Sequence, residues 1–387
     1  MLRKGFAATV VLLAALVTSA AADPAADPFV SYAGLPGKKA LAVAREGDAT
    51  VSGVAESEPS ESAAAFTALQ RCEEARFAAA LDAACEIVRA GAVEVTSGAT
   101  IRAGIPADAH PLFLWEFRSP TAKVYLAGSI HVMKPTLYPL PAQFDAAFAA
   151  SDRIVVEVDT VNAKPEMLQQ QMLQHATLPD GATIESVVSP ETYSTLSTFL
   201  AAQEIPLARV ARLRPAMLAT QLAVARLVAL GYMPNHGLEH HFLQRADDRP
   251  VLELESIADQ LEVLTSPPPD VQEEMLIETL EQMNTIEPIV ADMLTAWFSG
   301  DEADFMQLFE LTSGSSDGYD AFMDRILDAR NATMAERVSG YLATDGTYFV
   351  LVGSAHLAGP EGIPAILTAR GYPGRRIYST DVVATTR

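Results

Sequence analysis

Cysteine, basic residues and long apolar runs are all scarce in this sequence of 387 residues. Cys72 and Cys85 are the only cysteines, so no cysteine follows the N-terminal small-residue stretch and lipid attachment there is excluded. Lys and Arg number 27 against 49 Asp and Glu, and the net charge of −22 argues against electrostatic binding to nucleic acid or anionic lipid. No stretch beyond the N-terminal segment is long and apolar enough to span a membrane. We therefore expect a soluble protein with no nucleic-acid partner and no stable membrane anchor.

The first 22 residues have the pattern of a cleavable signal peptide. Arg3 and Lys4 precede an apolar run from Phe6 to about Val17, and small residues follow as far as Ala22. The run is shorter than the roughly 20 residues that a membrane-spanning helix needs. We expect cleavage after Ala22, which takes the formal charge from −22 to −24 and places the protein in the periplasm or outside the cell.

The residues after the signal peptide divide into a leader, a small module and a linker. Residues 23–38 show no apolar periodicity and are interpreted as an extended leader. Residues 39–96 are expected to form a compact β-β-α-β module, and residues 97–110 have the composition of a linker. Within the module, strands are expected at 40–45 and 50–54, a helix at 60–80 and a returning strand at 86–95.

Both cysteines lie in this module. An even pair in one short segment of an exported protein favours a structural disulfide, and the alternative is two buried thiols. In one continuous helix, Cys72 and Cys85 would be too far apart to bond. The disulfide therefore requires a bend between them, for which residues 81–84 are the natural place.

Residues 111–387 are expected to form the main domain, an α/β fold. Apolar strands separated by helices favour a central mixed, largely parallel sheet flanked by helices on both faces. Residues 165–230 are largely helical and are interpreted as a middle insertion that caps or flanks the sheet. The expected strands are a hairpin at 112–118 and 123–127, three apolar strands at 153–158, 251–254 and 347–352, and an edge strand at 376–379.

A repeated sequence motif gives the first indication of a functional site. The stretches KVYLAGSIHV, from Lys123, and YFVLVGSAHL, from Tyr348, each run from an apolar strand into Gly-Ser-x-His. The Gly permits a tight turn, the Ser is interpreted as a cap of that turn, and the His follows the carboxyl end of the strand. Because ligands gather beyond these ends in open α/β sheets, we expect His131 and His356 to face a shared pocket from neighbouring strands.

Two further apolar strands end in carboxylates. RIVVEVD places Glu157 and Asp159 on one side of its strand, and RPVLELES does the same for Glu253 and Glu255. Any one of these acids is as often solvated or paired with arginine as functional. Together with two histidines, they supply hard oxygen ligands for a cation, a general base, or both.

These motifs resemble those of the TraB/GumN family, which includes the Tiki-type membrane-bound metalloproteases and the plasmid pheromone-shutdown proteins. The resemblance covers about residues 112–378 and rests on the order and spacing of several stretches. These are WEFRSPTAKVYLAGSIHV, RIVVEVD, GLEHHFLQRADDRPVLELES, AWFSGD at 296–301, LDARN at 327–331, and YFVLVGSAHLAGPEGIPAILTARGY.

The resemblance implies a fold like that of the erythromycin-esterase and haem-binding ChaN proteins, with His and Glu side chains around one cleft. It implies that His131, Glu157, Arg330 and His356 belong to this cleft, and Glu255 matches a further family acid. In Tiki-like relatives the activity is divalent-metal-dependent peptide cleavage. The resemblance does not specify a substrate.

A metal-dependent hydrolase is the function that these residues favour. His131 and His356 would hold a divalent cation such as Zn, Mn or Co with help from Glu157 or Glu255, and bound water would become the nucleophile. The remaining carboxylate would move protons. Arg330 would hold a developing oxyanion or form a salt bridge to one of the glutamates, and the next residue, an Asn, would organise backbone. The expected substrate is a peptide or a small molecule.

Two other functions use the same cleft. The first is a non-catalytic binding protein for haem, metal or a signalling peptide. The second is a metal-free His/Glu esterase, whose activity would survive chelation.

His236, His240 and His241 form the densest histidine cluster. His236 and His240 have the i, i+4 spacing that binds metal on a helix, but Gly237 suits a helix start better than a helix interior. A solvated helix N-terminus is the preferred interpretation, and a secondary metal site is the alternative. Where many relatives have Gly-x-Asp, this chain has Glu239, so no role is assigned to that acid.

Overall fold

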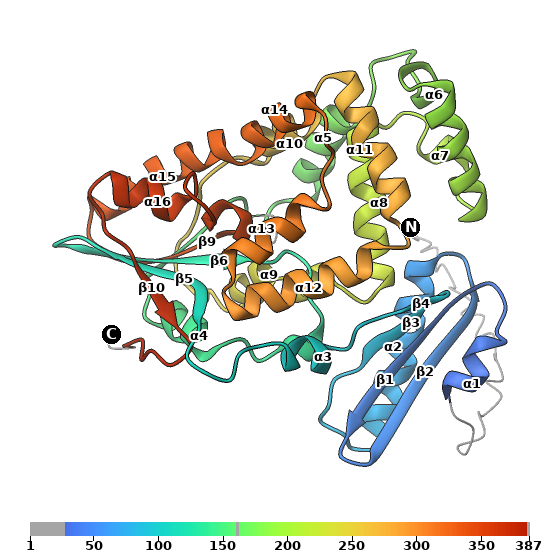
Figure 1. The fold of residues 1–387 in the computed structure, drawn as a ribbon, viewed down its shortest axis with the longest axis horizontal. Coiled ribbons are helices and arrows are strands. Elements are labelled where there is room, and N and C mark those ends of the chain that lie inside the picture. Colours follow the sequence, from blue (N-terminus) through green and yellow to red (C-terminus); the bar gives the residue numbers. More distant parts are fainter. Residues whose placement is uncertain (1–27, 160–161, 385–387) are drawn as a thin grey trace, which may run out of the picture.

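The computed structural model describes residues 28–159 and 162–384, and a six-stranded mixed sheet lies at its centre (Figure 1). The strands are β5 (Pro111–Arg118), β6 (Ala122–Ser129), β7 (Arg153–Val156), β8 (Val251–Glu253), β9 (Gly346–Gly353) and β10 (Arg375–Tyr378). Their order is β10-β5-β6-β9-β7-β8. β5 pairs antiparallel with β6 and β10, whereas β6, β9, β7 and β8 are parallel. The predicted α/β class and the hairpin are confirmed.

The parallel strands are apolar because both faces of the sheet are covered. Every side chain of β9 from Tyr348 to Val352 is buried. α15 (Asp328–Leu342) and α16 (Ile363–Ala369) lie on one side of the strands and α4 (Ala142–Ala149) on the other, as Figure 1 shows. Phe148 of α4 meets Phe349 edge-on, with ring centroids 5.5 Å apart. The carboxyl ends of the parallel strands are thereby held in fixed positions relative to one another.

Helices make up most of the remaining chain, as predicted for its middle part. Their apolar faces form a second core that includes Leu196, Leu200 and Leu276. Among the helices of residues 28–159 and 162–384, none combines the length and the apolar character needed to cross a bilayer. These helices are α5 (Pro165–Ala176), α6 (Ile184–Val187), α7 (Pro190–Ala202), α8 (Pro215–Ala229), α9 (Leu238–Leu243), α10 (Ile257–Thr265), α11 (Pro269–Gln282), α12 (Ile286–Ser299), α13 (Glu302–Glu310) and α14 (Asp317–Ile326).

A second, four-stranded antiparallel sheet lies near the N-terminus; its order is β-β-α-β-β, because the returning strand predicted at 86–95 is two paired strands. Its elements are β1 (Lys38–Glu46), β2 (Ala49–Glu58), α2 (Glu61–Ala78), β3 (Glu86–Ala90) and β4 (Val93–Glu94). Gly53 lets α2 approach β2, because a Cβ there would lie 2.2 Å from the backbone of Ala68 and of Cys72. Cys72 and Cys85 form a disulfide, with Cα atoms 6.1 Å apart, and α2 ends before residues 81–84 as the pairing requires.

Two stretches expected to be irregular contain short helices. The expected linker at 97–110 includes α3 (Gly98–Ala103), which Ser97 caps by accepting from the Thr100 amide. The expected leader at 23–38 includes α1 (Pro28–Ala33). Helices of six residues are too short to leave an apolar period in the sequence. The predicted signal peptide lies outside the described residues.

A buried polar network joins the N-terminal sheet to the main domain. The Thr96 amide donates to Glu287 Oε1 at 2.7 Å, and Lys134 Nζ donates to the Thr96 carbonyl. Lys134 is only 1% exposed, and its ammonium lies 4.6 Å from the centroid of the Tyr232 ring. Burial lowers the pKa of Lys134 to about 8, although the carboxylates of Glu86 and Glu287 oppose this shift.

This buried lysine gives the fold a testable pH dependence. Between about pH 8 and the ordinary lysine pKa of 10.5, the unfolded chain carries a proton on Lys134 that the folded chain lacks. The free energy of unfolding should therefore rise across this window, by up to about 3 kcal/mol. Lys134→Met should abolish this rise in urea unfolding, whereas Lys164→Met, at an exposed position, should leave it intact. Equal pH slopes for Lys134→Met and wild type would contradict the prediction.

Candidate functional site

The two Gly-Ser-x-His motifs meet at the carboxyl ends of neighbouring parallel strands. β6 and β9 pair in register, with Ser129 opposite Gly353. The hydroxyl of Ser354 donates to the carbonyl of Ser129 at 2.9 Å and so ties the two motifs together. His131 follows β6 directly, and His356 lies in a 3-10 turn, Ser354–Leu357, that follows β9. The structure thus brings both histidines to one edge of the sheet.

A glycine leaves space between the key side chains. A Cβ built on Gly353 would lie 3.2 Å from Glu157 Oε1, 3.5 Å from His356 Cδ2 and 3.6 Å from His131 Nε2. The three side chains therefore surround one point, and this point is open because Gly353 has no Cβ atom. The Gly353 amide also donates to Glu157 Oε1 and fixes that carboxylate at the end of β7.

An arginine from α15 joins the acids at the ends of β7 and β8. Arg330 donates through Nη2 to Glu157 Oε2 at 2.9 Å and to Glu255 Oε2 at 2.7 Å, and its Nε contacts both oxygens of Glu255 at 3.0 Å. All three side chains are about nine-tenths buried. Burial alone would raise the pKa of Glu157, but the imidazoles of His356 and His131 and the Arg330 guanidinium hold it below its ordinary value.

His356 is held as a neutral imidazole. Its Nδ1 lies 2.6 Å from Oδ1 of Asn331, and the amide nitrogen of Asn331 donates to the carbonyl of Glu361 at 2.9 Å. Since this amide oxygen can only accept, the proton of His356 resides on Nδ1. Arg330 Nη1 lies 3.2 Å from Nε2, and burial lowers the pKa of His356 to about 4. Asn331 therefore bonds to backbone, as expected, and in addition orients the His356 ring.

His131 has a carboxylate partner that the sequence did not identify. Its Nδ1 lies 2.9 Å from Glu239 Oε1, and the Ser129 hydroxyl donates to the same oxygen. Glu239 raises the pKa of His131 to about 9. Glu239 comes from α9, whose start approaches the His131 loop closely because Gly237 has no side chain: a Cβ there would lie 2.2 Å from the His131 carbonyl. The residue to which no role was assigned is thus in direct contact with the site.

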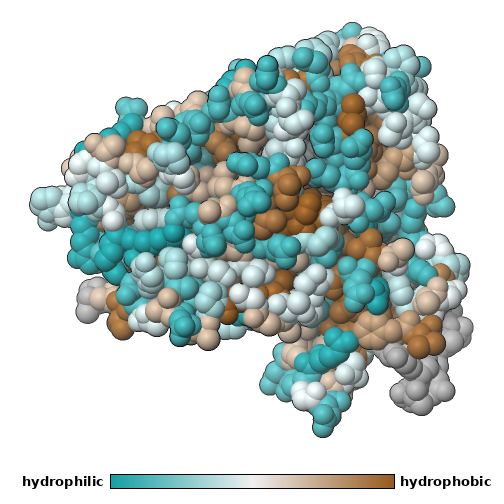
Figure 2. All heavy atoms as spheres, viewed as in Figure 1, coloured by the Kyte–Doolittle hydropathy of each residue, from teal (hydrophilic) through white to brown (hydrophobic). Residues whose placement is uncertain are grey.

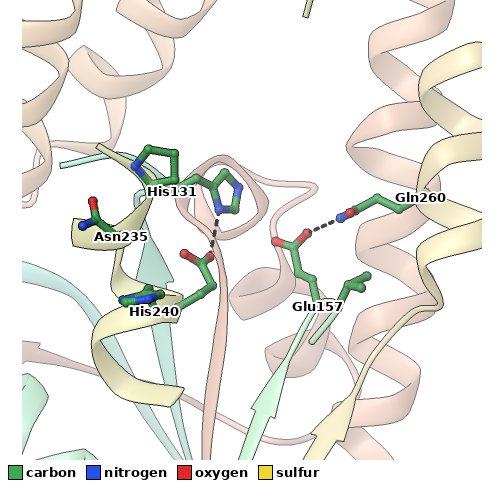
Figure 3. Close-up of a pocket in the computed structure, with 8 residues that line it drawn as sticks. His131, Glu157, Asn235, His240 and Gln260 are labelled. Atoms are coloured by element: carbon green, nitrogen blue, oxygen red, sulfur yellow. Dashed lines mark hydrogen bonds and ion pairs between the residues drawn. The ribbon is translucent and has the colours of Figure 1, made fainter. Parts of the chain in front are cut away.

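A polar cavity of about 520 Å³ opens between these groups. Figure 3 shows His131 and Glu157 facing each other across it, with Gln260 beside Glu157; Glu239 also lines the cavity. Gln260 donates to Glu157 Oε2 at 3.1 Å. The cavity has the size of a small-ligand pocket and carries its ionisable groups at its floor.

Other candidates from the sequence lie at or beyond the rim. His240 lines the cavity, whereas Glu253 accepts a bond from the Asp159 amide at 2.7 Å and lines neither this cavity nor the arginine cluster. His241 packs against Tyr138 with the rings tilted by 37° and their centroids 4.7 Å apart. The predicted helix start is confirmed, since α9 begins after Gly237, but this start is not solvated, because Gly237 and Leu238 are buried.

Residues 113–376 match the model of the TraB/PrgY/gumN family. The chain belongs to this family. Comparison with curated proteins and with solved structures gave no match. The matched range contains all the site residues described above and excludes the N-terminal sheet, so the TraB/PrgY/gumN part of the chain carries the complete site.

The donor set of this TraB/PrgY/gumN site suits a divalent cation in chemical type. The Nδ1 atoms of both histidines are engaged by Glu239 and Asn331, which leaves each Nε2 as the available donor, as in many metal sites. His356 Nε2 lies 3.9 Å from Glu157 Oε1. Within the described ranges 28–159 and 162–384, no three His, Cys, Asp or Glu side chains already form a ligand cluster. Arg330 accounts for this, because its Nη1 faces the lone pair of His356 Nε2 and would have to withdraw.

Proposed function

We propose that this TraB/PrgY/gumN protein is a divalent-metal-dependent hydrolase of ester or amide bonds in a peptide or small molecule. One observation carries the proposal: two imidazoles and a carboxylate surround the point that Gly353 leaves free. Ionisable groups that shift one another's pKa values around a cavity are typical of active sites; here Glu157 and His356 are buried, whereas the His131 side chain is 67% exposed.

His131, His356 and Glu157 are the residues that would hold the cation. A bound divalent cation supplies a nucleophile near neutral pH because it lowers the pKa of water to about 7. The chain's own contribution is orientation. Glu239 and Asn331 fix the two imidazoles, and the Gly353 amide and Gln260 fix Glu157.

Arg330 and Glu255 have a joint role in this proposal. Glu255 holds the guanidinium through three contacts of 2.7 to 3.0 Å, so we assign it the positioning of Arg330 rather than contact with substrate. Arg330 stays paired with Glu157 and Glu255 through Nη2 and Nε, so its positive charge remains at the site when Nη1 withdraws from His356. It is placed to stabilise negative charge that develops on a carbonyl oxygen. The site thereby combines an acceptor of protons, Glu157, with a fixed positive group.

A metal-free variant of the same chemistry is the second candidate. It is favoured by the Arg330 contact that already occupies the lone pair of His356 Nε2. Here Glu157 takes a proton from a water molecule in the cavity, and His131, protonated by virtue of Glu239, donates one to the leaving group from Nε2. The two candidates share the substrate class and differ only in the need for a cation.

One set of measurements separates them. The purified protein is analysed for metal and assayed on a panel of esters and peptides, before and after chelation and after readdition of Zn, Mn or Co. Loss of activity on chelation with recovery on readdition is expected; unchanged activity supports the metal-free candidate. His131→Ala and His356→Ala should abolish hydrolysis, whereas His175→Ala, on α5 and outside the site, should not. Retention of a tight ligand with no turnover under any condition rejects both candidates in favour of a binding protein.

We also infer that the protein is exported, because its first 22 residues combine a basic start, a short apolar run and a small-residue end. N-terminal sequencing of protein recovered from the periplasm or the medium should begin at Asp23. A cytoplasmic protein with an intact N-terminus would overturn this inference.

A further inference from the structure

A second cavity, of about 580 Å³, opens onto the same catalytic floor from another side. Its floor includes His131, Gly353, His356 and Arg330, and its walls come from α8, α10, α11, α12, α13 and α14. Figure 1 shows these helices grouped beside the sheet, and Figure 2 shows hydrophobic side chains gathered in the middle of this face. His131 lines both cavities and therefore lies between a polar chamber and this second chamber.

The walls of the second cavity are hydrocarbon and thioether. Four methionines line it, with Phe305 and Phe309 among the aromatic residues. Methionine walls adapt to a flexible apolar ligand because the side chain is unbranched and polarisable. These four are Met275, Met283, Met293 and Met323.

Most of the polar side chains in these walls are already engaged, although Arg226, which pairs with Glu61 through Nη1 at 2.7 Å, has an Nε without a hydrogen-bond partner. The hydroxyl of Thr279 donates to the Met275 carbonyl at 2.8 Å and that of Thr312 to the Phe309 carbonyl at 2.7 Å. Ser313 also donates to the Phe309 carbonyl, and Gln282 donates to that of Leu311. A peptide backbone in this cavity would bury its carbonyl groups with few donors to satisfy them, at a cost of roughly 1–3 kcal/mol each. An aliphatic chain has no such requirement.

We propose that the second cavity binds the acyl chain of an amphiphilic ester or amide whose carbonyl lies at the His131–Glu157 floor and whose polar group occupies the first cavity. This inference rests on the proposed hydrolase function and names its substrate class. The first cavity suits a polar group that forms hydrogen bonds, because its lining includes Asn235, Glu239 and Gln260. Cleavage adds water across the acyl bond, so the acyl carbon gains a hydroxyl and the leaving oxygen or nitrogen gains a proton.

Binding can be tested without turnover. The probes are n-alkyl ureas from butyl to dodecyl, which present a neutral polar head and no ester, titrated calorimetrically into the full mature chain. Each added methylene is expected to tighten binding about fourfold until the chain fills the cavity. A flat series would overturn the inference, as would binding of a capped trileucine peptide as tight as that of dodecyl urea.

Two variants of one wall residue keep the test independent of folding defects. Val290, half-buried on α12, lines the cavity. Val290→Asp should weaken binding of the longer ureas at least tenfold, and the apolar Val290→Phe should move the best chain length to a shorter one. Leu173→Asp, at an exposed position on α5, is the matched control and should leave the series unchanged. If neither Val290 variant changed the dependence of affinity on chain length, the alkyl chain would bind outside this cavity and the inference would be wrong.

A parallel series of 4-nitrophenyl acyl esters separates this inference from the proposed function. Chain-dependent urea binding with no hydrolysis of any ester would leave the acyl pocket in place and reject the hydrolase. Hydrolysis of all esters at equal kcat/KM, with a flat urea series, would keep the hydrolase and overturn the acyl pocket. Binding of haem alone, with a Soret band that Val290→Asp abolishes, would also overturn it.

Discussion

Gly353→Ala is expected to lower kcat/KM at least about a hundredfold on whichever acyl compound the wild type hydrolyses. The added methyl group would lie 3.2 Å from Glu157 Oε1 and within 3.6 Å of atoms of both His131 and His356. It would fill the point that a cation or the reacting atoms must occupy. The fold should persist, because the backbone at Gly353 has φ −52°, which alanine adopts readily.

A second glycine provides the matched control for this variant. Gly340 lies on α15, and a Cβ there would meet nothing within 4 Å. Gly340→Ala should stabilise the protein by about 0.5–1 kcal/mol and leave kcat/KM unchanged. Full activity in Gly353→Ala, with a normal unfolding transition, would show that the chemistry occurs elsewhere.

Arg330→Met is expected to destabilise the protein by about 3–5 kcal/mol, because it leaves two buried carboxylates without their cation. Both carboxylates, Glu157 and Glu255, are 8% exposed, and neither can reach solvent easily. Activity should fall about a hundredfold to a thousandfold, the range for loss of a group that stabilises a developing oxyanion. Urea unfolding and kcat/KM on the same preparation provide the two readouts.

The stability and activity effects of Arg330 can be separated with a double variant. The double variant Arg330→Met/Glu255→Gln removes one of the two buried carboxylates that lack a cation in Arg330→Met. It should recover part of the lost stability, but not the activity. Arg337→Met, at an exposed position of the same helix, should change the unfolding free energy by less than about 0.5 kcal/mol. If the double variant regained activity together with stability, the guanidinium would have only a structural function.

The strands of the main sheet were predictable because each one follows from a pattern that is local in the sequence. Each central strand is a short apolar run, and the repeated Gly-Ser-x-His motif marked two strand ends of the same kind. Ligands of open α/β sheets bind at the carboxyl ends of the strands, and this rule led to the prediction that His131 and His356 lie on neighbouring strands. The structure agrees, with β6 and β9 side by side.

The partners of those histidines could not be predicted in the same way. Glu239 reaches His131 because α9 docks against the strand-end loop, a contact that depends on the absence of a side chain at Gly237. The Gly-Leu-Glu stretch contained that signal, but it was used only to place a helix start. Asn331 reaches His356 from α15, and nothing in the local sequence indicates which ring it meets.

The apolar cavity was also hidden from the sequence. Its walls come from six helices, α8 and α10 to α14, and their apolar residues follow a periodic pattern that would equally describe a filled core. Met293 and Phe309 line the cavity, whereas Leu294 and Trp297 of the same region are buried in the core. Only the arrangement of the helices decides which apolar positions remain unfilled.

The pairing of β6 with β9 also restricts when the protein can become active. The bond from Ser354 to Ser129 spans 225 positions of the chain, and His356 comes only 31 positions before the C-terminus. Contacts of such long sequence separation form slowly, after much of the chain has collapsed. A ribosome-bound or truncated chain would hold His131 and Glu157 yet lack the strand that carries Gly353. Under the proposed function, a chain that ends before β9 would therefore lack the hydrolytic site.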